Sequence, residues 1–239
     1  MNAVVSATEW RAARVALLAK EKALTRARDA VNAERAALPW VRVEAPYAFA
    51  TARGKETLAA LFQGRSQLIV QHFMFAPDWT EGCVGCSFSA DHVDATLPHL
   101  AARDVTFVAV SRAPLERILA FKRRMGWGFD WVSSLGSDFN YDFGVSIRPE
   151  DAAAGRAEYN YRPGGSGEMP GHSAFYRDGT GAVFHSYSTF ARGDEAMCNT
   201  YNFVDIAPLG RNESGLSAPM AWLRHHDRYG NEAGGCCAT

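Results

Sequence analysis

The chain has 239 residues, of which 47% are hydrophobic and 21% are charged, and its formal net charge is -1. This composition is typical of one folded domain with additions, and the charge gives no basis for binding nucleic acid or an anionic membrane. No apolar run approaches the roughly 20 residues needed to cross a bilayer. The N-terminus lacks the basic start and apolar block of a secretory signal, so we expect a cytoplasmic protein.

Residues 6–38 are predicted to be helical and to form most of an N-terminal extension, residues 1–39. Ser6 and Glu9 have the spacing of a capping box, and Pro39 marks the end of the helix. Apolar residues recur every seven positions in a narrow stripe, Trp10, Leu17, Leu24, Val31 and Leu38. We expect this stripe to pack along the outside of the chain's own domain. The alternative is a homodimer in which it meets a second copy.

Strands and helices alternate after Pro39. Gln67–Phe75 and Val105–Val110 are nearly continuous apolar runs, which are typical of strands covered on both faces. Helices are predicted from about Cys83 to Ala102 and from Pro114 to about Met125, so the first strands should be parallel.

The second half of the chain predicts a long insertion and a hairpin. Residues 148–171 are rich in Gly, Pro and Ala and have few large aliphatics, which predicts an insertion. Ser173–Arg177 and Ala182–Ser188 are strand-like runs joined through Asp178-Gly179, a hairpin signal. This order predicts an α/β protein with a thioredoxin-like fold (three-layer α/β/α, central mixed sheet) over residues 40–208. Residues 209–239 form a C-terminal extension with a short helix, Pro219–Arg228, and a flexible tail.

Five cysteines stand at positions 83, 86, 198, 236 and 237, an odd number with irregular spacing. In a reducing compartment, a close pair of cysteines is redox-active or metal-binding more often than it is a structural disulfide. Zinc needs a second pair of ligands, which the spacing does not offer, so we expect no metal and no other cofactor. We expect Cys198 to be a small core residue and Cys236-Cys237 to lie on an exposed tail.

Cys83 and Cys86 fall where a predicted strand passes into a predicted helix. Unpaired N–H groups at the start of a helix favour a thiolate and lower the pKa of a cysteine. Two intervening residues bring the second sulfur close enough to resolve a mixed disulfide. The sequence therefore predicts a thiol–disulfide oxidoreductase that acts on a disulfide or a small thiol, with Cys83 as the nucleophile and Cys86 as the resolving thiol. Glu81 should oppose the thiolate.

Two known folds suggest supporting residues around the pair. In thioredoxins, the strand that leads to the active site carries a buried acid, and aligning the strands puts His72 near it as a proton acceptor for Cys86. Thr80, three residues before Cys83, resembles the threonine that hydrogen-bonds the peroxidatic thiolate of peroxiredoxins. That resemblance makes a peroxidase the main alternative, with Arg112 or Arg177 as its arginine.

The chain resembles a large bacterial family of uncharacterised thioredoxin-like proteins that are labelled predicted dithiol–disulfide oxidoreductases. The resemblance covers nearly the whole chain and includes these strings: EWRAARVALLAKEKALTRARD, LPWVRV, LFQGRSQLIVQHFMFAPDW, GCVGCSFSADH, HLAARDVTFVAVSRAPL, RMGWGFDWVSS, SDFNYDFGVS, FHSYSTFARG and IAPLGRNE. It implies a thioredoxin-like fold with a redox-active C-x-x-C pair.

The chain also departs from thioredoxin itself. Trp79 stands four residues before Cys83 rather than directly beside it, and Pro170 stands three residues before Ser173. His172-Ser173 would then replace the proline that thioredoxins set against their active-site disulfide. A third interpretation is a non-catalytic module that uses the fold and the N-terminal helix for assembly.

Overall fold

The computed structural model describes residues 2–230, and the chain divides into two compact units at Trp40 and Val41. The first unit contains one long helix, α1 (Ala7–Ala36). The predicted capping box is confirmed, since Glu9 N donates to Ser6 Oγ at 3.3 Å and Ser6 N donates to Glu9 Oε2 at 2.9 Å. No residue of α1 is buried, and the heptad stripe is exposed. Among the residues described, no helix is both long and apolar enough to span a membrane.

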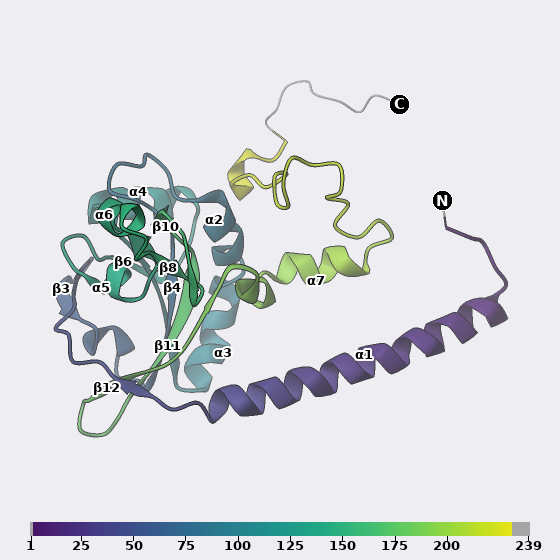
Figure 1. Cartoon of the computed structure of the whole chain (residues 1–239), viewed down its shortest axis with the longest axis horizontal. Coiled ribbons are helices and arrows are strands. Elements are labelled where there is room, and N and C mark those ends of the chain that lie inside the picture. The colour runs from purple at the N-terminus through teal and green to yellow at the C-terminus, as the bar shows by residue number, and fades with distance from the viewer. Residues whose placement is uncertain (1, 231–239) are drawn as a thin grey trace. The chain divides into compact units, whose positions relative to one another are not determined.

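The second unit is organised by one eight-stranded sheet of order β1-β12-β11-β4-β5-β6-β2-β3 (Figure 1). The pairs β4–β5 and β5–β6 are parallel, and the other pairs are antiparallel. The strands are β1 (Val41–Arg42), β2 (Ala48–Thr51), β3 (Gly54–Thr57), β4 (Gln67–His72), β5 (Val105–Ser111), β6 (Asp130–Ser133), β11 (Gly171–Arg177) and β12 (Val183–Phe190). Parallel strands joined by helices and followed by an antiparallel hairpin make this a thioredoxin-like fold with a mixed central sheet.

Different elements cover the two faces of the sheet. Three helices, α2 (Val84–Ala90), α3 (Leu97–Ala102) and α4 (Leu115–Arg124), pack on one face around an aromatic cluster that includes Phe73 and Trp131. The short helices η1 (Ala60–Phe62) and α5 (Phe139–Asp142) cover the other face. The single helix predicted over 83–102 is wrong, because α2 ends at Ala90 and η2 (Asp94–Thr96) precedes α3. Pro98, in the first turn of α3, has no N–H for a continuous helix.

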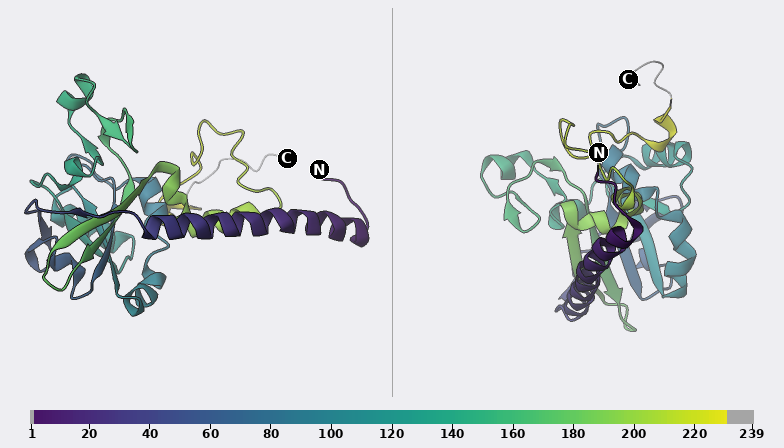
Figure 2. Two further views of the ribbon diagram at one scale, coloured as in Figure 1. Left: turned by 60° about the horizontal axis from the view of Figure 1, so that its bottom comes forward. Right: turned by 90° about the vertical axis from the view of Figure 1, so that its right-hand side faces the viewer.

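The predicted insertion, residues 148–171, forms short elements together with the strand that precedes it. They are β7 (Ser146–Ile147), α6 (Pro149–Ala153), β8 (Glu158–Tyr159), β9 (Arg162–Pro163) and β10 (Gly167–Glu168). β10 pairs with β7, and β8 pairs with β9. Figure 2 (left) shows this segment projecting beside the central sheet. The hairpin signal is confirmed, since Asp178 Oδ1 accepts from the N–H groups of Thr180 and Ala182 at the β11–β12 turn.

After β12 the chain forms η3 (Ala191–Met197), α7 (Asn199–Ile206) and η4 (His226–Arg228). The helix predicted over Pro219–Arg228 is wrong except for η4. The Glu213 carboxylate accepts from Met220 N at 3.1 Å and from Trp222 Nε1 at 2.7 Å, and these bonds hold the segment in turns. Met220, Trp222 and Leu223 pack with Phe88 of α2.

Candidate active site

A tight loop delivers Cys83 to the start of α2. A Cβ at Gly82 would lie 2.7 Å from Phe73 Cε1, so only glycine lets the loop lie against this core ring. Cys83 N then donates to Met74 O at 3.0 Å, and the Cys83 carbonyl accepts from Ser87 N at 2.9 Å. Cys83 is thereby fixed at the N-cap of α2, with its side chain half-buried.

The two thiols of the pair are free and interact with each other. Cys86 donates its S–H to Cys83, and together with the N–H groups of Cys86 and Gly85 this lowers the Cys83 pKa to about 6 against the opposing effect of burial. The same bond and complete burial raise the pKa of Cys86 well above its usual value. The two shifts are opposite in direction, so Cys83 is the more acidic thiol of the pair and Cys86 the less acidic one.

A cavity of about 320 Å³ opens beside the pair. Its walls come from β4, α2, the start of β11, η3, α7 and the C-terminal segment, and they include Gln71, Cys83, Cys86, Ser89, Pro170, His172, Asp194, Cys198, Tyr201 and Met220. Gln71 Nε2 donates to Cys86 O at 3.1 Å, which joins β4 to α2 beneath the cavity. A Cβ at Gly85 would lie 3.8 Å from Cys83 Sγ, so the glycine keeps the approach to this sulfur open.

A histidine–aspartate pair faces the thiols across this cavity. His172 is opposite Gln71 in the β11–β4 register, and its Nδ1 lies 3.2 Å from Asp194 Oδ1 of η3. The imidazole is buried, and the Asp194 carboxylate is 14% exposed. Gly193 allows this approach, because a Cβ there would lie 2.1 Å from Thr189 Oγ1.

The charge of Glu81 is neutralised by two arginines. Arg124 bonds Glu81 at 2.6 Å, and Arg228 of η4 also forms an ion pair with it. Burial raises the pKa of Glu81, but the two guanidinium groups outweigh that effect and lower it overall. His225 Nε2 lies 2.9 Å from Gly82 O, so the C-terminal segment also contacts the loop before Cys83. The predicted opposition of Glu81 to the thiolate is therefore offset by these arginines.

His72 belongs to the opposite face of the sheet. It contributes to the cavity wall, but its ring stacks on Phe143 and its Nε2 lies 2.7 Å from Ser173 Oγ. The series of hydrogen bonds continues through Ser188 Oγ to His185 Nε2, each step 2.7 Å long.

Burial, His172 and His185 lower the His72 pKa to about 3. Side chains alternate along a strand, so Gln71 and not His72 faces α2, and we do not retain His72 as the proton acceptor of Cys86.

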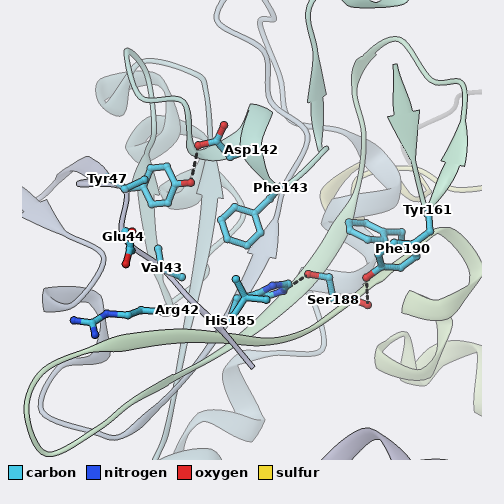
Figure 3. A pocket seen from close by; sticks show the side chains of 12 residues that line it. Arg42, Val43, Glu44, Tyr47, Asp142, Phe143, Tyr161, His185, Ser188 and Phe190 are labelled. Carbon is cyan, nitrogen blue, oxygen red and sulfur yellow. Dashed lines mark hydrogen bonds between the residues drawn. The ribbon is translucent and has the colours of Figure 1, made fainter. Parts of the chain in front are cut away.

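Figure 3 shows where this series of hydrogen bonds ends, on the far face of the sheet. His185 and Ser188 line a second pocket of about 330 Å³, together with Phe143 and the Tyr47–Asp142 pair. Tyr47 donates its O–H to Asp142 Oδ2 at 2.6 Å. Ser173 therefore connects His72 to this second pocket, and its hydroxyl does not face the thiols.

The remaining predicted residues are exposed or have partners other than the two thiols. Trp79 packs against the aromatic cluster, and its carbonyl accepts from Arg117 at 2.7 Å. Thr80 is exposed. Arg112 binds Glu168 at 2.6 Å and stacks over Tyr141, so its guanidinium is directed to the insertion.

Sequence reasoning missed Gln71 and Asp194, and it gave His172 only the place of the thioredoxin proline, with no role for its imidazole. Gln71 is adjacent in sequence to His72, and a strict alternation of the strand would have turned Gln71 toward α2. Asp194 follows the hairpin in a segment without periodicity, and no signal in the sequence points to it. Cys198 is buried as predicted, but its thiol also reaches the cavity, and burial raises its pKa to about 11.

The topology and the thiol pair at the strand–helix junction define a thioredoxin-like protein. The chain belongs to the bacterial family of proteins of unknown function DUF899, whose model matches residues 1–229. Comparison with curated proteins gave no match to this chain.

Similar solved structures are peroxiredoxins. A mutant of peroxiredoxin Q from Xanthomonas campestris is 16% identical, with a TM-score of 0.46, over 70% of this chain and 98% of that one. Peroxidoxin BcpB from Mycobacterium tuberculosis is 13% identical, with a TM-score of 0.45, over 70% and 97%. The mitochondrial 2-Cys peroxiredoxin from Plasmodium falciparum is 14% identical, with a TM-score of 0.38, over 76% and 97%.

Proposed function

We propose that the protein is a thiol–disulfide oxidoreductase with Cys83 as nucleophile and Cys86 as resolving thiol. The observation that carries this proposal is the placement of both thiols, Cys83 at the N-cap and Cys86 in the first turn of α2, at the wall of an open cavity. A thiolate with a pKa of about 6 is formed at neutral pH without a separate base.

The proposed reaction has two exchange steps. The Cys83 thiolate attacks a substrate disulfide, forms a mixed disulfide and releases one substrate thiolate. Cys86 then loses its proton, attacks the Cys83 sulfur and releases the second thiolate, which leaves a Cys83–Cys86 disulfide. Two electrons pass from the pair to the substrate, and an external thiol must return them.

The size of the cavity supports a small substrate. About 320 Å³ is at the lower end of the range for small-molecule sites, so we propose a low-molecular-weight disulfide. We propose the cytoplasm as the location, because five irregularly spaced cysteines make a poor disulfide framework and a close pair is typical of a reducing compartment.

Comparing Cys83→Ser with the wild type tests the function. We expect reduction of a small disulfide such as cystamine, coupled to an external thiol, to fall by about a thousandfold or more in the variant. Wild-type rates in Cys83→Ser would rule out the proposal. Consumption of hydrogen peroxide that requires Cys83, without disulfide reduction, would favour the peroxidase instead. Reactivity of Cys83 no greater than that of a free thiol would favour the assembly module.

A further inference from the structure

His172 is buried and Asp194 is mostly buried, and the two exchange steps leave both groups unused. They share the cavity with both thiols, and His172 Nδ1 lies 3.2 Å from Asp194 Oδ1. Among the described residues neither of these two atoms has a hydrogen-bond partner, and their approach to each other is an ion-pair contact only. Burying such groups is costly unless something in the cavity interacts with them.

Ionisable groups lie around His172 on several elements. Cys83 at the N-cap of α2, Cys86 on α2 and Asp194 on η3 share its cavity. His72 on β4 interacts electrostatically with His172, and Tyr159 on β8 does so with Asp194 and Cys86. Burial raises the Tyr159 pKa to about 12 and is the main reason that the His72 pKa falls to about 3, so both stay neutral near pH 7.

The other charges of the cavity are already paired. Arg192 binds Glu195 at 3.1 Å, and Glu195 also binds Arg211 at 3.2 Å. Asp194 is therefore the carboxylate that acts on His172. It favours a proton on Nδ1 and leaves Nε2 as the basic nitrogen.

The second exchange step needs a proton acceptor. Cys86 is fully buried and its S–H is engaged with Cys83, so it attacks the mixed disulfide only after losing that proton. We infer that His172, oriented by Asp194, accepts the Cys86 proton as Cys86 attacks the mixed disulfide on Cys83. The Cys86–Cys83 bond forms, the bond from Cys83 to the substrate sulfur breaks, and the imidazolium returns its proton to the departing thiolate. Asp194 is a positioning residue that stabilises the imidazolium.

This inference rests on the proposed function of the pair, and one assay separates the two claims. Dithiobis(nitrobenzoate) releases one coloured thiolate when Cys83 attacks and a second when Cys86 resolves the mixed disulfide. The full-length chain carries Cys198→Ser, Cys236→Ser and Cys237→Ser, so that only the pair reacts. A first phase no faster than a free thiol contradicts the proposed function, and the second phase by itself tests His172.

His172→Asn keeps a donor near the Nδ1 position but cannot accept the proton. We expect the first phase to stay within about twofold and the second to slow by about tenfold or more near pH 7, with its midpoint displaced to alkaline pH. The matched control is His185→Gln, which lies on the opposite face and outside this cavity, and in which both phases stay at the wild-type rate. An unchanged second phase in His172→Asn, or equal slowing of both phases, would overturn the inference.

Asp194→Asn gives a second test, because our inference and a purely electrostatic effect on Cys86 predict opposite changes in the second phase. The charge of Asp194 contributes to raising the Cys86 pKa, so its loss would speed the second phase if electrostatics at Cys86 were its sole effect. Our inference expects that phase to slow by several-fold, because the imidazolium loses its counter-ion. Asp194→Glu should restore part of the rate. A faster second phase in Asp194→Asn contradicts the inference.

Discussion

The two faces of β4 and β11 carry histidines at adjacent register positions and use them differently. His72 pairs with Gly171, and His172 pairs with Gln71. On one face, His72 belongs to a continuous hydrogen-bonded chain that runs through two serines to His185. On the other face, His172 meets a carboxylate beside a cavity that also holds both thiols.

The difference shows how strand alternation separates structural from reactive polar groups. A buried histidine that is packed between aromatic rings and bonded to a serine stays neutral and fixes the sheet. A buried histidine beside a carboxylate, in the wall of a cavity that also holds the thiols, can exchange protons. The thiol face should therefore control rates, and the far face should control stability.

The largest effect is expected on the thiol face, from Cys86→Ala. Loss of the S–H donor should raise the Cys83 pKa from about 6 toward the value of about 8.5 for a free thiol. At pH 6.5 we expect Cys83 to react with iodoacetamide at least about tenfold more slowly, as followed by mass spectrometry of its peptide. A pH profile equal to that of the wild type would show that Cys86 does not activate Cys83.

On the far face, His72→Gln should change the pH dependence of stability. The His72 pKa of about 3 lies below the usual 6.5. Between these two pH values, the imidazole is therefore protonated in the unfolded chain and neutral in the native state. His72 therefore lowers the free energy of unfolding as pH falls, by about 2 kcal/mol between pH 6.5 and 4.5. Urea titrations should show a shallower decline in the variant, whose glutamine keeps a donor near Ser173. An equal decline of the free energy of unfolding in the wild type and the variant would contradict the low pKa of His72.

The smallest effect is expected outside both faces, at Arg228. Its ion pair with Glu81 is partly exposed, and Arg124 also holds Glu81. Arg228→Ala should lower the free energy of unfolding by at most about 1 kcal/mol and should change the Cys83 alkylation profile only slightly. A loss above about 2 kcal/mol in urea titration would show that η4 holds the loop before Cys83 more strongly than its exposure suggests.

Local patterns in the sequence predicted much of the fold. The capping box at Ser6, the buried runs of β4 and β5 and the Asp178 turn depend on neighbouring residues, so they can be recognised without tertiary information. The helix predicted at Pro219 was wrong because Glu213, a distant side chain, takes up the backbone and indole donors of that segment.

The candidate site was less accessible to prediction. The sequence pointed to both cysteines, because strand, spacing and helix occur together at that position. It favoured His72 over His172, because assigning a face requires the register between β11 and β4, which links residues about 100 positions apart. Asp194 lies in the site because η3 follows β12 directly and turns toward the cavity. No local pattern in the sequence predicts that turn.

Mapping the disulfide that forms during turnover tests the central claim most directly. The reduced protein is mixed with a small excess of cystamine at pH 7, quenched with acid and digested, and its disulfide-linked peptides are identified by mass spectrometry. Our account predicts a Cys83–Cys86 disulfide in the wild type and a Cys83–cysteamine adduct in Cys86→Ser. Recovery of both thiols in reduced form, or a disulfide that does not include Cys83, would contradict it.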